Sequence, residues 1–371
     1  MLCGYAFNGE DIVEQGSYLL MRGINITEGS IRHSSELDRY YSGSIEKLDK
    51  YKLAVGDLVI GMDGSKVGRN SAIVSSYEDG SYLVQRVCRI KSSIGNNYIL
   101  QFINNTKFHQ YVDTVKTSSA IPHISLGDIQ NFRISIPPTQ DETDKIAKLF
   151  LLLDERIATQ NKIIEKLESL IRGIVTKICS GAFVKGKYVF LRDILIERHI
   201  KNTENYEVYS VSVSQGIINQ IDYLGRSFAA KETLHYNVVN YGDIVYTKSP
   251  TGDFPYGIVK RSHILKPVAV SPLYGVYQPK NDYIGKYLHL YFKSPINTKN
   301  YLHRLIQKGA KNTINITNSH FLDNNVFIPE KPELINIVNL TFAIEDKLVL
   351  ASRMLDSLKS QKGYLLSKMF I

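Results

Sequence analysis

Four polar segments carry the side chains that could contact a nucleic acid. Lysine and arginine reach backbone phosphates, and arginine can donate two hydrogen bonds to one guanine. Each segment by itself is better explained as a solvated loop, but the four form two pairs at related positions of the chain, which favours paired contact surfaces. The candidate contact residues are Lys66, Arg69 and Asn70 (segment 64–71), Ser118, Ser119 and His123 (116–123), Lys248 (247–252), and Lys308, Lys311 and Asn312 (307–313).

Sequence motifs of catalysis are missing. No Pro-Asp dipeptide opens a nuclease signature, and the only Pro-Pro pair follows Ile136 rather than the Asn or Asp of an amino-methyltransferase motif. Residues 181–188 resemble a Walker A loop, but they lack the Ser or Thr that would hold Mg²⁺ and follow a predicted helix instead of a strand. We therefore predict no catalytic residue, no metal site and no cofactor; an enzyme with a diffuse active site is an alternative.

The excess of positive charge lies in one stretch. The 371 residues hold 45 Lys and Arg against 36 Asp and Glu, a net charge of +9, and residues 185–328 alone hold 18 against 10. A basic domain gains affinity for nucleic acid through phosphate attraction. Many basic domains have no such partner, so charge by itself favours this idea only weakly.

The three cysteines, Cys3, Cys88 and Cys179, are odd in number and far apart. This spacing excludes a disulfide framework and a four-cysteine zinc site, and it fits a reducing compartment. No apolar run is long enough to span a bilayer, and residues 1–16 show no secretory signal. We predict a cytoplasmic protein.

The chain repeats itself with a period of about half its length. Residues 124–137 (ISLGDIQNFRISIP) return as 316–329 (ITNSHFLDNNVFIP), and 51–59 resemble 236–245. A period this long indicates a duplicated module rather than a solenoid. The predicted order is a globular domain (1–138), a spacer helix (139–184), a second globular domain (185–328) and a C-terminal spacer helix (329–371).

Both spacer segments show the pattern of a coiled coil. Thr139 and Glu142 form a capping box that starts the first helix, and apolar residues then recur at heptad spacing over more than four heptads. The simplest partner for each helix is the other, in an antiparallel pair with a pseudo-twofold axis; two independent core helices are the alternative. The predicted seam consists of Ile146, Phe150, Leu153, Ile157, Ile164, Leu167, Ile171 and Ile174 in the first helix and Ile344, Leu348, Leu355, Leu358 and Leu365 in the second.

The globular parts have the pattern of mixed α/β domains. Short helices are expected at 98–112 and 283–307, and a strand is expected before each spacer helix, at 132–136 and 325–328. The predicted fold class is α/β (mixed), with two globular domains separated by two long helices. Further strands are predicted by Tyr-rich and β-branched runs at 58–60, 82–90, 206–213 and 269–277.

This duplicated order resembles the specificity (S) subunit of type I restriction–modification enzymes. The strongest match is Ile134-Ser-Ile-Pro-Pro-Thr-Gln-Asp-Glu142, followed by Lys145-Ile-Ala, Leu152-Leu-Asp-Glu-Arg-Ile157 and Lys177-Ile178, which is similar to the family's central repeated region. Gly4-Tyr-Ala-Phe7 with Gly23-Ile-Asn-Ile26 resembles the start of a target recognition domain, and residues 51–60 resemble a strand inside it.

The resemblance implies a non-catalytic subunit that recognises double-stranded DNA. Each target recognition domain would read one half of a bipartite target through the major groove, and the helical pair would act as a ruler for the gap between the half-sites. The implied partners are DNA-adenine methyltransferase (M) subunits, two of them expected, and a restriction and translocase (R) subunit. These partners would carry the enzymatic activities.

Two departures from the family pattern have consequences. Residues 189–194 open the second domain without a counterpart in the first, so an edge element of the first recognition domain is expected to be missing. The family's Glu-Gln pair after the prolines is here Glu142-Thr143, and the second copy (329–333) is more diverged, so docking of M subunits could be asymmetric. The alternative function is a coiled-coil scaffold that binds proteins, which predicts no salt-dependent DNA binding.

Overall fold

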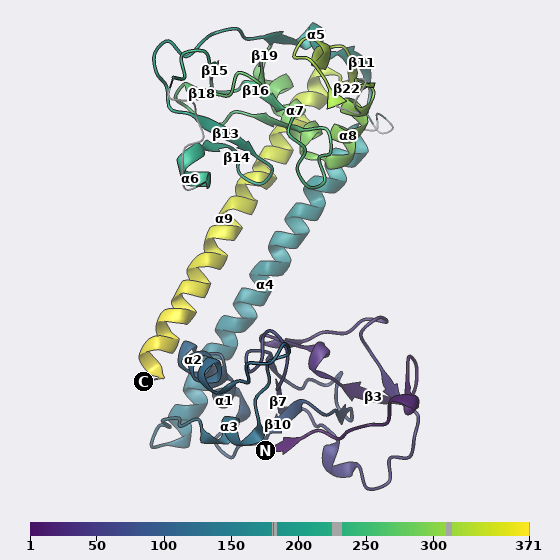
Figure 1. Ribbon diagram of the computed structural model, residues 1–371, viewed down its shortest axis with the longest axis vertical. Helices are drawn as coiled ribbons and strands as arrows, with labels where there is room; N and C mark the ends of the chain where they lie inside the picture. Colours follow the sequence, from purple (N-terminus) through teal and green to yellow (C-terminus); the bar gives the residue numbers. More distant parts are fainter. Residues whose placement is uncertain (180, 182–183, 225–231, 309–313, 371) are drawn as a thin grey trace. The chain divides into compact units, whose positions relative to one another are not determined.

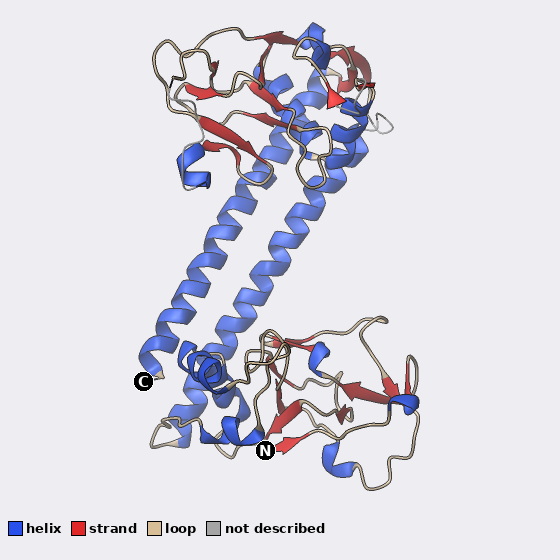
Figure 2. Ribbon diagram, viewed as in Figure 1, coloured by secondary structure: helices blue, strands red, loops and turns tan. Residues whose placement is uncertain are grey.

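The computed structural model describes residues 1–179, 181, 184–224, 232–308 and 314–370. The chain forms two compact units (Figure 1, Figure 2): unit 1 consists of Met1–Asn161 and Arg353–Ile371, and unit 2 of Lys162–Ser352. Each unit holds one globular part and a portion of both long helices, α4 (Gln140–Cys179) and α9 (Lys331–Met369). Helices and strands occur in both units, which confirms the mixed α/β class.

A four-stranded antiparallel sheet forms the centre of unit 1. Both of its faces are covered, which explains why β7 is apolar along its whole length instead of alternating. On one face, Leu58 and Ile60 pack against Phe108 and Val112 of helix α2; on the other, Val59 lies in a second apolar cluster. The strand order is β1 (Leu2–Cys3), β10 (Val87–Ile90), β7 (Leu58–Gly61) and β8 (Ser71–Ile73), and the helices on the first face are α1 (Asn96–Ile103) and α2 (Thr106–Val115).

The other strands of unit 1 are short. A second sheet has the order β2 (Ile12–Val13), β6 (Tyr40–Tyr41), β3 (Tyr18–Met21) and β9 (Tyr82–Leu83), and β4 (Ile26–Thr27) pairs with β5 (Ser30–Ile31). Helix α3 (Leu126–Asn131) begins with the Ser125–Asp128 capping box and directly precedes the extended segment that leads into α4.

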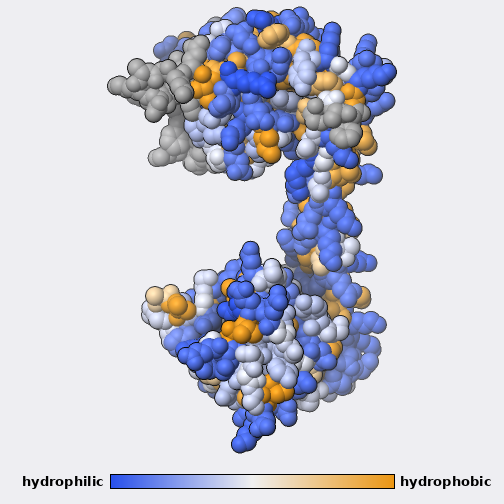
Figure 3. Space-filling view, turned by 90° about the vertical axis from the view of Figure 1, so that its right-hand side faces the viewer, coloured by the Kyte–Doolittle hydropathy of each residue, from blue (hydrophilic) through white to orange (hydrophobic). Residues whose placement is uncertain are grey.

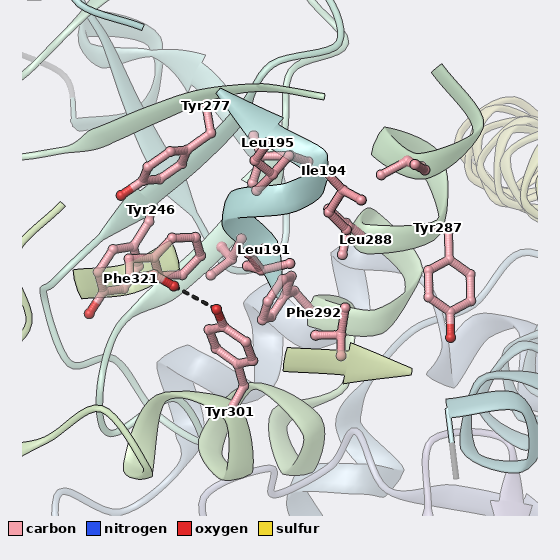
Figure 4. Packing of buried hydrophobic residues seen from close by; sticks show 14 of the residues in the cluster. Leu191, Ile194, Leu195, Tyr246, Tyr277, Tyr287, Leu288, Phe292, Tyr301 and Phe321 are labelled. Carbon is pink, nitrogen blue, oxygen red and sulfur yellow. Dashed lines mark hydrogen bonds between the residues drawn. The ribbon is translucent and has the colours of Figure 1, made fainter. Parts of the chain in front are cut away.

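The central sheet of unit 2 repeats that of unit 1. Its order is β12 (Leu195–Glu197), β19 (Gly275–Pro279), β16 (Ile244–Thr247) and β17 (Ile258–Arg261), and helices α7 (Asp282–Lys293) and α8 (Pro295–His303) follow it as α1 and α2 follow the first sheet. Aromatic side chains fill the space between sheet and helices (Figure 4): Tyr246 and Tyr277 stack on Phe321, and the Tyr301 hydroxyl donates to the Phe321 carbonyl at 2.5 Å.

Unit 2 also has elements outside this sheet. The paired strands are β11 (Gly186–Phe190) with β22 (Asn325–Pro329), β13 (Tyr209–Ser212) with β14 (Gly216–Asn219), β15 (Asn237–Val239) with β18 (Val268–Val270), and β20 (Gln307–Lys308) with β21 (Ile314–Asn315). Two short helices are α5 (Leu191–Ile194) and α6 (Gln220–Leu224).

One hydrogen bond occurs at the same place in both units. In unit 1 the Tyr98 hydroxyl of α1 donates to the Ser135 carbonyl at 3.3 Å, and in unit 2 the Tyr287 hydroxyl of α7 donates to the Phe327 carbonyl at 2.8 Å. In each case a helix of the globular part holds the segment that leads into a long helix. The duplication predicted from sequence therefore extends to individual tertiary contacts.

Within each unit the two long helices pack side by side and antiparallel. In unit 1 the Phe150 ring of α4 contacts Phe370 of α9, and Asp154, one turn later, pairs with Lys362, two turns earlier in α9. In unit 2 the late α4 residue Ile171 packs against Ile344, an early residue of α9. The predicted antiparallel pairing is thus confirmed within each unit.

The predicted seam residues are distributed over buried and half-buried positions of these helices. Phe150, Leu153, Ile171, Ile344, Leu355 and Leu358 are buried, and Ile146, Ile157, Ile164, Leu167, Ile174, Leu348 and Leu365 are half-buried. Helix α4 begins one residue after Thr139, whose hydroxyl accepts a hydrogen bond from the backbone N–H of Glu142.

Two predictions about secondary structure are wrong. Residues 132–136 are extended but form no strand, because no described segment of unit 1 pairs with them, whereas the equivalent 325–329 is β22 and pairs with β11. The single helices predicted at 98–112 and 283–307 are each two helices. In the range 98–112, Asn105 caps a new helix. In the range 283–307, Ser294 caps a new helix whose first residue is Pro295.

Candidate nucleic-acid interface

In unit 1 the structure brings two of the predicted contact segments together. The loop between β7 and β8 (residues 62–70) and the segment 116–123 are joined by a hydrogen bond from Gly64 N to Pro122 O at 3.0 Å and by a β-bridge between Asp63 and His123. Gly68, with a φ of +72°, lies so close to Val112 that a side chain would clash, which explains the glycine there. Lys66, Arg69, Asn70, Ser118, Ser119 and His123 therefore belong to one surface.

The two cations of the β7–β8 loop are paired with exposed carboxylates. Lys66 Nζ lies 3.0 Å from Glu28, and Arg69 Nη2 lies 3.1 Å from Asp113, which also pairs with Lys116 at 2.6 Å. The hydrogen bond from Lys116, together with Arg69, lowers the pKa of Asp113. Exposed ion pairs contribute little to stability, so a DNA phosphate can compete with these carboxylates for the cations.

Glu28 and Asp113 are the members of this site that sequence reasoning missed. Both come from segments far from residues 62–70 in the chain. A charge pattern along a sequence does not reveal which acid folds next to which base, so the sequence contains no usable signal for them.

Serine and histidine side chains shape the segment 116–123. His123 Nδ1 and the Ser119 hydroxyl both lie 3.0 Å from the Thr117 hydroxyl, and Ser119 Oγ donates to Ile121 O at 2.7 Å. These groups hold the turn, whereas Ser118 is exposed at its tip. Ser118 is thus better placed to contact a ligand than the other two.

In unit 2 the corresponding segments are only partly described. Lys248 is half-buried at the end of β16, where the loop to β17 turns back through a β-bridge between Thr251 and Phe254. Lys308 lies in β20, and Lys311 and Asn312 lie outside the described residues. The Tyr256 and His303 rings, 5.8 Å apart, connect the β16–β17 loop to the end of α8, close to the start of the second segment.

Part of the positive charge of unit 2 is internal. Arg261 is 1% exposed, donates to Asp282 at 2.6 Å and lies over the Tyr241 ring. Arg198 makes two hydrogen bonds to buried Asp243, and burial raises the pKa of that carboxyl although Arg198 opposes the rise. Each of these arginines is paired with an acid of the same segment, so the excess positive charge of residues 185–328 comes from other side chains.

Apolar side chains are exposed on the long helices in both units. In unit 1, Leu152 and Met354 line a groove of about 420 Å³, and both are about half exposed. In unit 2, Leu348 and Ile296 are among the residues that line a larger groove of about 920 Å³ between the long helices, α7, α8 and the loop at 252–255. Figure 3 shows apolar patches scattered over one face of the molecule that is otherwise mostly hydrophilic.

Within the described part of the chain, no three metal-binding side chains come together, and no helix has the length and apolar character needed to cross a membrane.

A family model matches the N-terminal part of the chain. Residues 3–169 match the family model of the Type I restriction modification DNA specificity domain. Residues 3–169 are thus similar to a type I specificity domain. The match covers the globular part of unit 1 and most of α4, which is where the sequence resemblance is strongest. No curated protein sequence is significantly similar to the chain.

The fold of the specificity subunit extends over the whole chain. The S subunit of a type I restriction–modification system from M. genitalium is 14% identical, covers 100% of this chain and 93% of its own, and superposes with a TM-score of 0.62. Two further structures have lower scores: a chain of a type I R-M system studied for complex assembly and conformational transition (13% identical, 85% and 82% covered, TM-score 0.46), and the HsdS subunit from Thermoanaerobacter tengcongensis (13%, 95% and 90%, 0.41). The predicted family resemblance is confirmed.

Proposed function

We propose that this chain is the DNA-recognition subunit of a type I restriction–modification complex in the cytoplasm and reads a bipartite double-stranded target, one half-site per globular part. The observation that carries the proposal is the duplicated β-sheet with a polar loop at the same place, β7–β8 in unit 1 and β16–β17 in unit 2. Two similar reading surfaces in one chain fit a target made of two half-sites.

The long helices would fix the distance between the half-sites. A helix rises about 1.5 Å per residue and is stiff, so 40 residues in α4 set a separation that a flexible linker could not hold. Because DNA turns about once every 10.5 base pairs, a fixed separation also fixes the groove phase of the second half-site.

The same helices would dock the adenine methyltransferase (M) subunits, two of them, and the complex would include a restriction and translocase (R) subunit. Exposed Leu152 and Met354 in unit 1 and exposed Leu340 and Leu350 in unit 2 leave apolar surface for helices of a partner. In this proposal the chain itself catalyses no reaction and needs no cofactor; the partners carry methylation and cleavage.

A methylation map tests the whole proposal. Adenine methylation is mapped across a genome with this chain present or deleted, beside its methyltransferase partner. We expect a split motif that disappears with the chain. If methylation is unchanged and the purified complex also shows no salt-dependent DNA binding, a scaffold function replaces the proposal.

The unit 1 surface can be tested separately on duplex DNA. Arg69→Ala should weaken binding and lower the salt slope by about one, whereas Asp113→Asn should strengthen binding several-fold, because it releases Arg69 and Lys116 from their carboxylate. Arg133→Ala, an exposed arginine outside the surface, is the matched control. Weaker binding of Asp113→Asn, or equal losses in Arg69→Ala and Arg133→Ala, would contradict the assigned surface.

A further inference from the structure

Two of the three cysteines lie directly opposite each other in the central sheet of unit 1. Cys3 of β1 and Cys88 of β10 are partners in the antiparallel register. They are 85 positions apart in the chain, so the sequence gives no hint of this arrangement. The third cysteine, Cys179, lies at the end of α4 in unit 2, where its sulfur is 3.9 Å from the Tyr287 hydroxyl oxygen.

The backbone pattern places the two thiols on the same side of the sheet at short range. Gly4 N donates to Val87 O at 2.9 Å, so the Gly4–Val87 pair is hydrogen-bonded and the adjacent Cys3–Cys88 pair is not. In a pair of this kind the Cα atoms are about 4.5 Å apart. That distance lies at the near end of the range that a disulfide spans, roughly 4.4–6.8 Å.

The surroundings of the two cysteine side chains support the same arrangement as the backbone register. Both cysteines belong to one apolar cluster, in which Cys88 is fully buried and Cys3 is half-buried. The Cys3 thiol donates to Met62 Sδ at 3.7 Å, and the Cys88 thiol donates to Arg89 O at 3.6 Å. The Cα separation typical of such a pair allows a disulfide to form by rotation of the two side chains, without movement of the backbone.

We propose that Cys3 and Cys88 are a reversible disulfide site that closes when the protein meets a disulfide oxidant such as oxidised glutathione. The more accessible Cys3 thiolate attacks the oxidant, forms a mixed disulfide and releases one reduced glutathione. The Cys88 thiolate then attacks Cys3 Sγ and releases the second glutathione. The two departing glutathione thiolates take up the equivalent of the two cysteine protons through solvent, and the two electrons from the cysteines reduce the oxidant.

The Cys3–Cys88 disulfide would link β1 covalently to β10 at the edge of the sheet. In the reduced protein β1 is short: it pairs with β10 through Leu2 and Cys3, and the Gly4 N–H donates to Val87 O just beyond it. A bond at Cys3 removes the freedom of this strand to leave the sheet. The opposite edge is β8, which leads out of the loop that carries Lys66 and Arg69, so the site lies in the same sheet as the proposed contact surface.

The chemistry is slow near neutral pH. Burial raises the pKa of both thiols, that of Cys88 to about 12, and the N-terminal ammonium opposes the rise only weakly. Because only thiolates react, oxidation is best followed at pH 8.5 and over hours.

The test counts free thiols in the full chain before and after incubation with oxidised glutathione. We expect three thiols to fall to one, a Cys3–Cys88 linkage in non-reduced peptide maps, and full recovery with a reductant. Cys179→Ser should fall from two thiols to none by the same linkage, and Cys3→Ser should form no internal disulfide. The oxidised wild type should also unfold at higher urea.

Three results would overturn the proposal: three free thiols after prolonged oxidation, glutathione adducts without the internal linkage, or a disulfide between chains. Since the linkage is mapped in the wild-type protein, the test does not depend on whether a cysteine variant folds.

Discussion

Replacing Lys260 by methionine tests how unit 2 accommodates a buried charge. Lys260 lies in β17, is 6% exposed, and its Nζ donates to Val213 O at 2.7 Å. Burial, with a smaller contribution from the positive charge of Lys293, lowers the pKa of Lys260 from 10.5 to about 8. Methionine is unbranched and of similar length, so it fills the same space without a charge.

The pKa of Lys260 gives both the sign and the size of the effect. The folded protein releases this proton near pH 8 and the unfolded chain near pH 10.5, so between these values the unfolded chain binds more protons and the free energy of unfolding rises with pH. Below pH 8 the charged form costs about 3 kcal/mol, at about 1.4 kcal/mol per pKa unit. Between pH 7 and pH 9.5 the wild type recovers about 2 kcal/mol of this cost.

The variant has no proton to release, and it loses a hydrogen bond at Val213 O that is worth about 1–3 kcal/mol at every pH. The stability of Lys260→Met relative to the wild type should therefore fall by about 2 kcal/mol from pH 7 to pH 9.5. Urea unfolding of unit 2, followed by circular dichroism at three pH values, measures this difference, and other titrating groups cancel in it.

Lys266→Met is the matched control. Lys266 is exposed, and its hydrogen bond and ion pair with Glu207, 2.7 Å away, raise its pKa. It stays charged in both states across this range, so the difference between this variant and the wild type should not depend on pH. A pH-independent difference for Lys260→Met would refute the reasoning.

The remaining predictions concern unit 1 and the long helices. The backbone amide of Ile136 has no hydrogen-bond partner among the described residues, whereas Ile328 pairs with β11. Amide hydrogen exchange should therefore be at least about 100-fold slower at Ile328 than at Ile136. Equal exchange rates would contradict the finding that residues 132–136 have no partner strand. Phe150→Ala should cost about 3–5 kcal/mol in urea unfolding, because the ring is fully buried, and half-exposed Leu152→Ala should cost much less. Inserting four residues, about one helical turn, into both α4 and α9 should change the length of the gap in the methylated motif and leave its half-sites intact. An unchanged gap would contradict the proposal that the long helices set the distance between the half-sites.

Local sequence signals predicted the elements that depend on nearby residues. The capping box at Thr139 and the heptads that follow it predicted α4, and the buried run at 58–60 predicted β7. These signals work because helix capping and burial periodicity involve residues a few positions apart. The same local rules explain why the ranges 98–112 and 283–307 each hold two helices, because Asn105 and Ser294 cap a new helix within them.

Pairing across the chain could not be predicted in the same way. Residues 132–136 and 325–329 have related sequences, yet only the second segment is a strand, because β11 supplies its partner. A strand is a property of two segments, so its existence depends on a partner that the local sequence does not contain. The candidate surface of unit 1 also depends on segments that are distant in the sequence, since Arg69 and Asp113 form an ion pair only in the folded chain.

The sequence by itself determined the duplication, the two long helices and the family resemblance, because each is recorded in residue order and periodicity. The tertiary structure alone decided which charges face solvent and which are internal, as with Lys66 at the surface and Arg261 in the interior. It also decided that Cys3 and Cys88 face each other. Burial and proximity between distant residues arise from how sheets and helices pack, and composition carries no record of that packing.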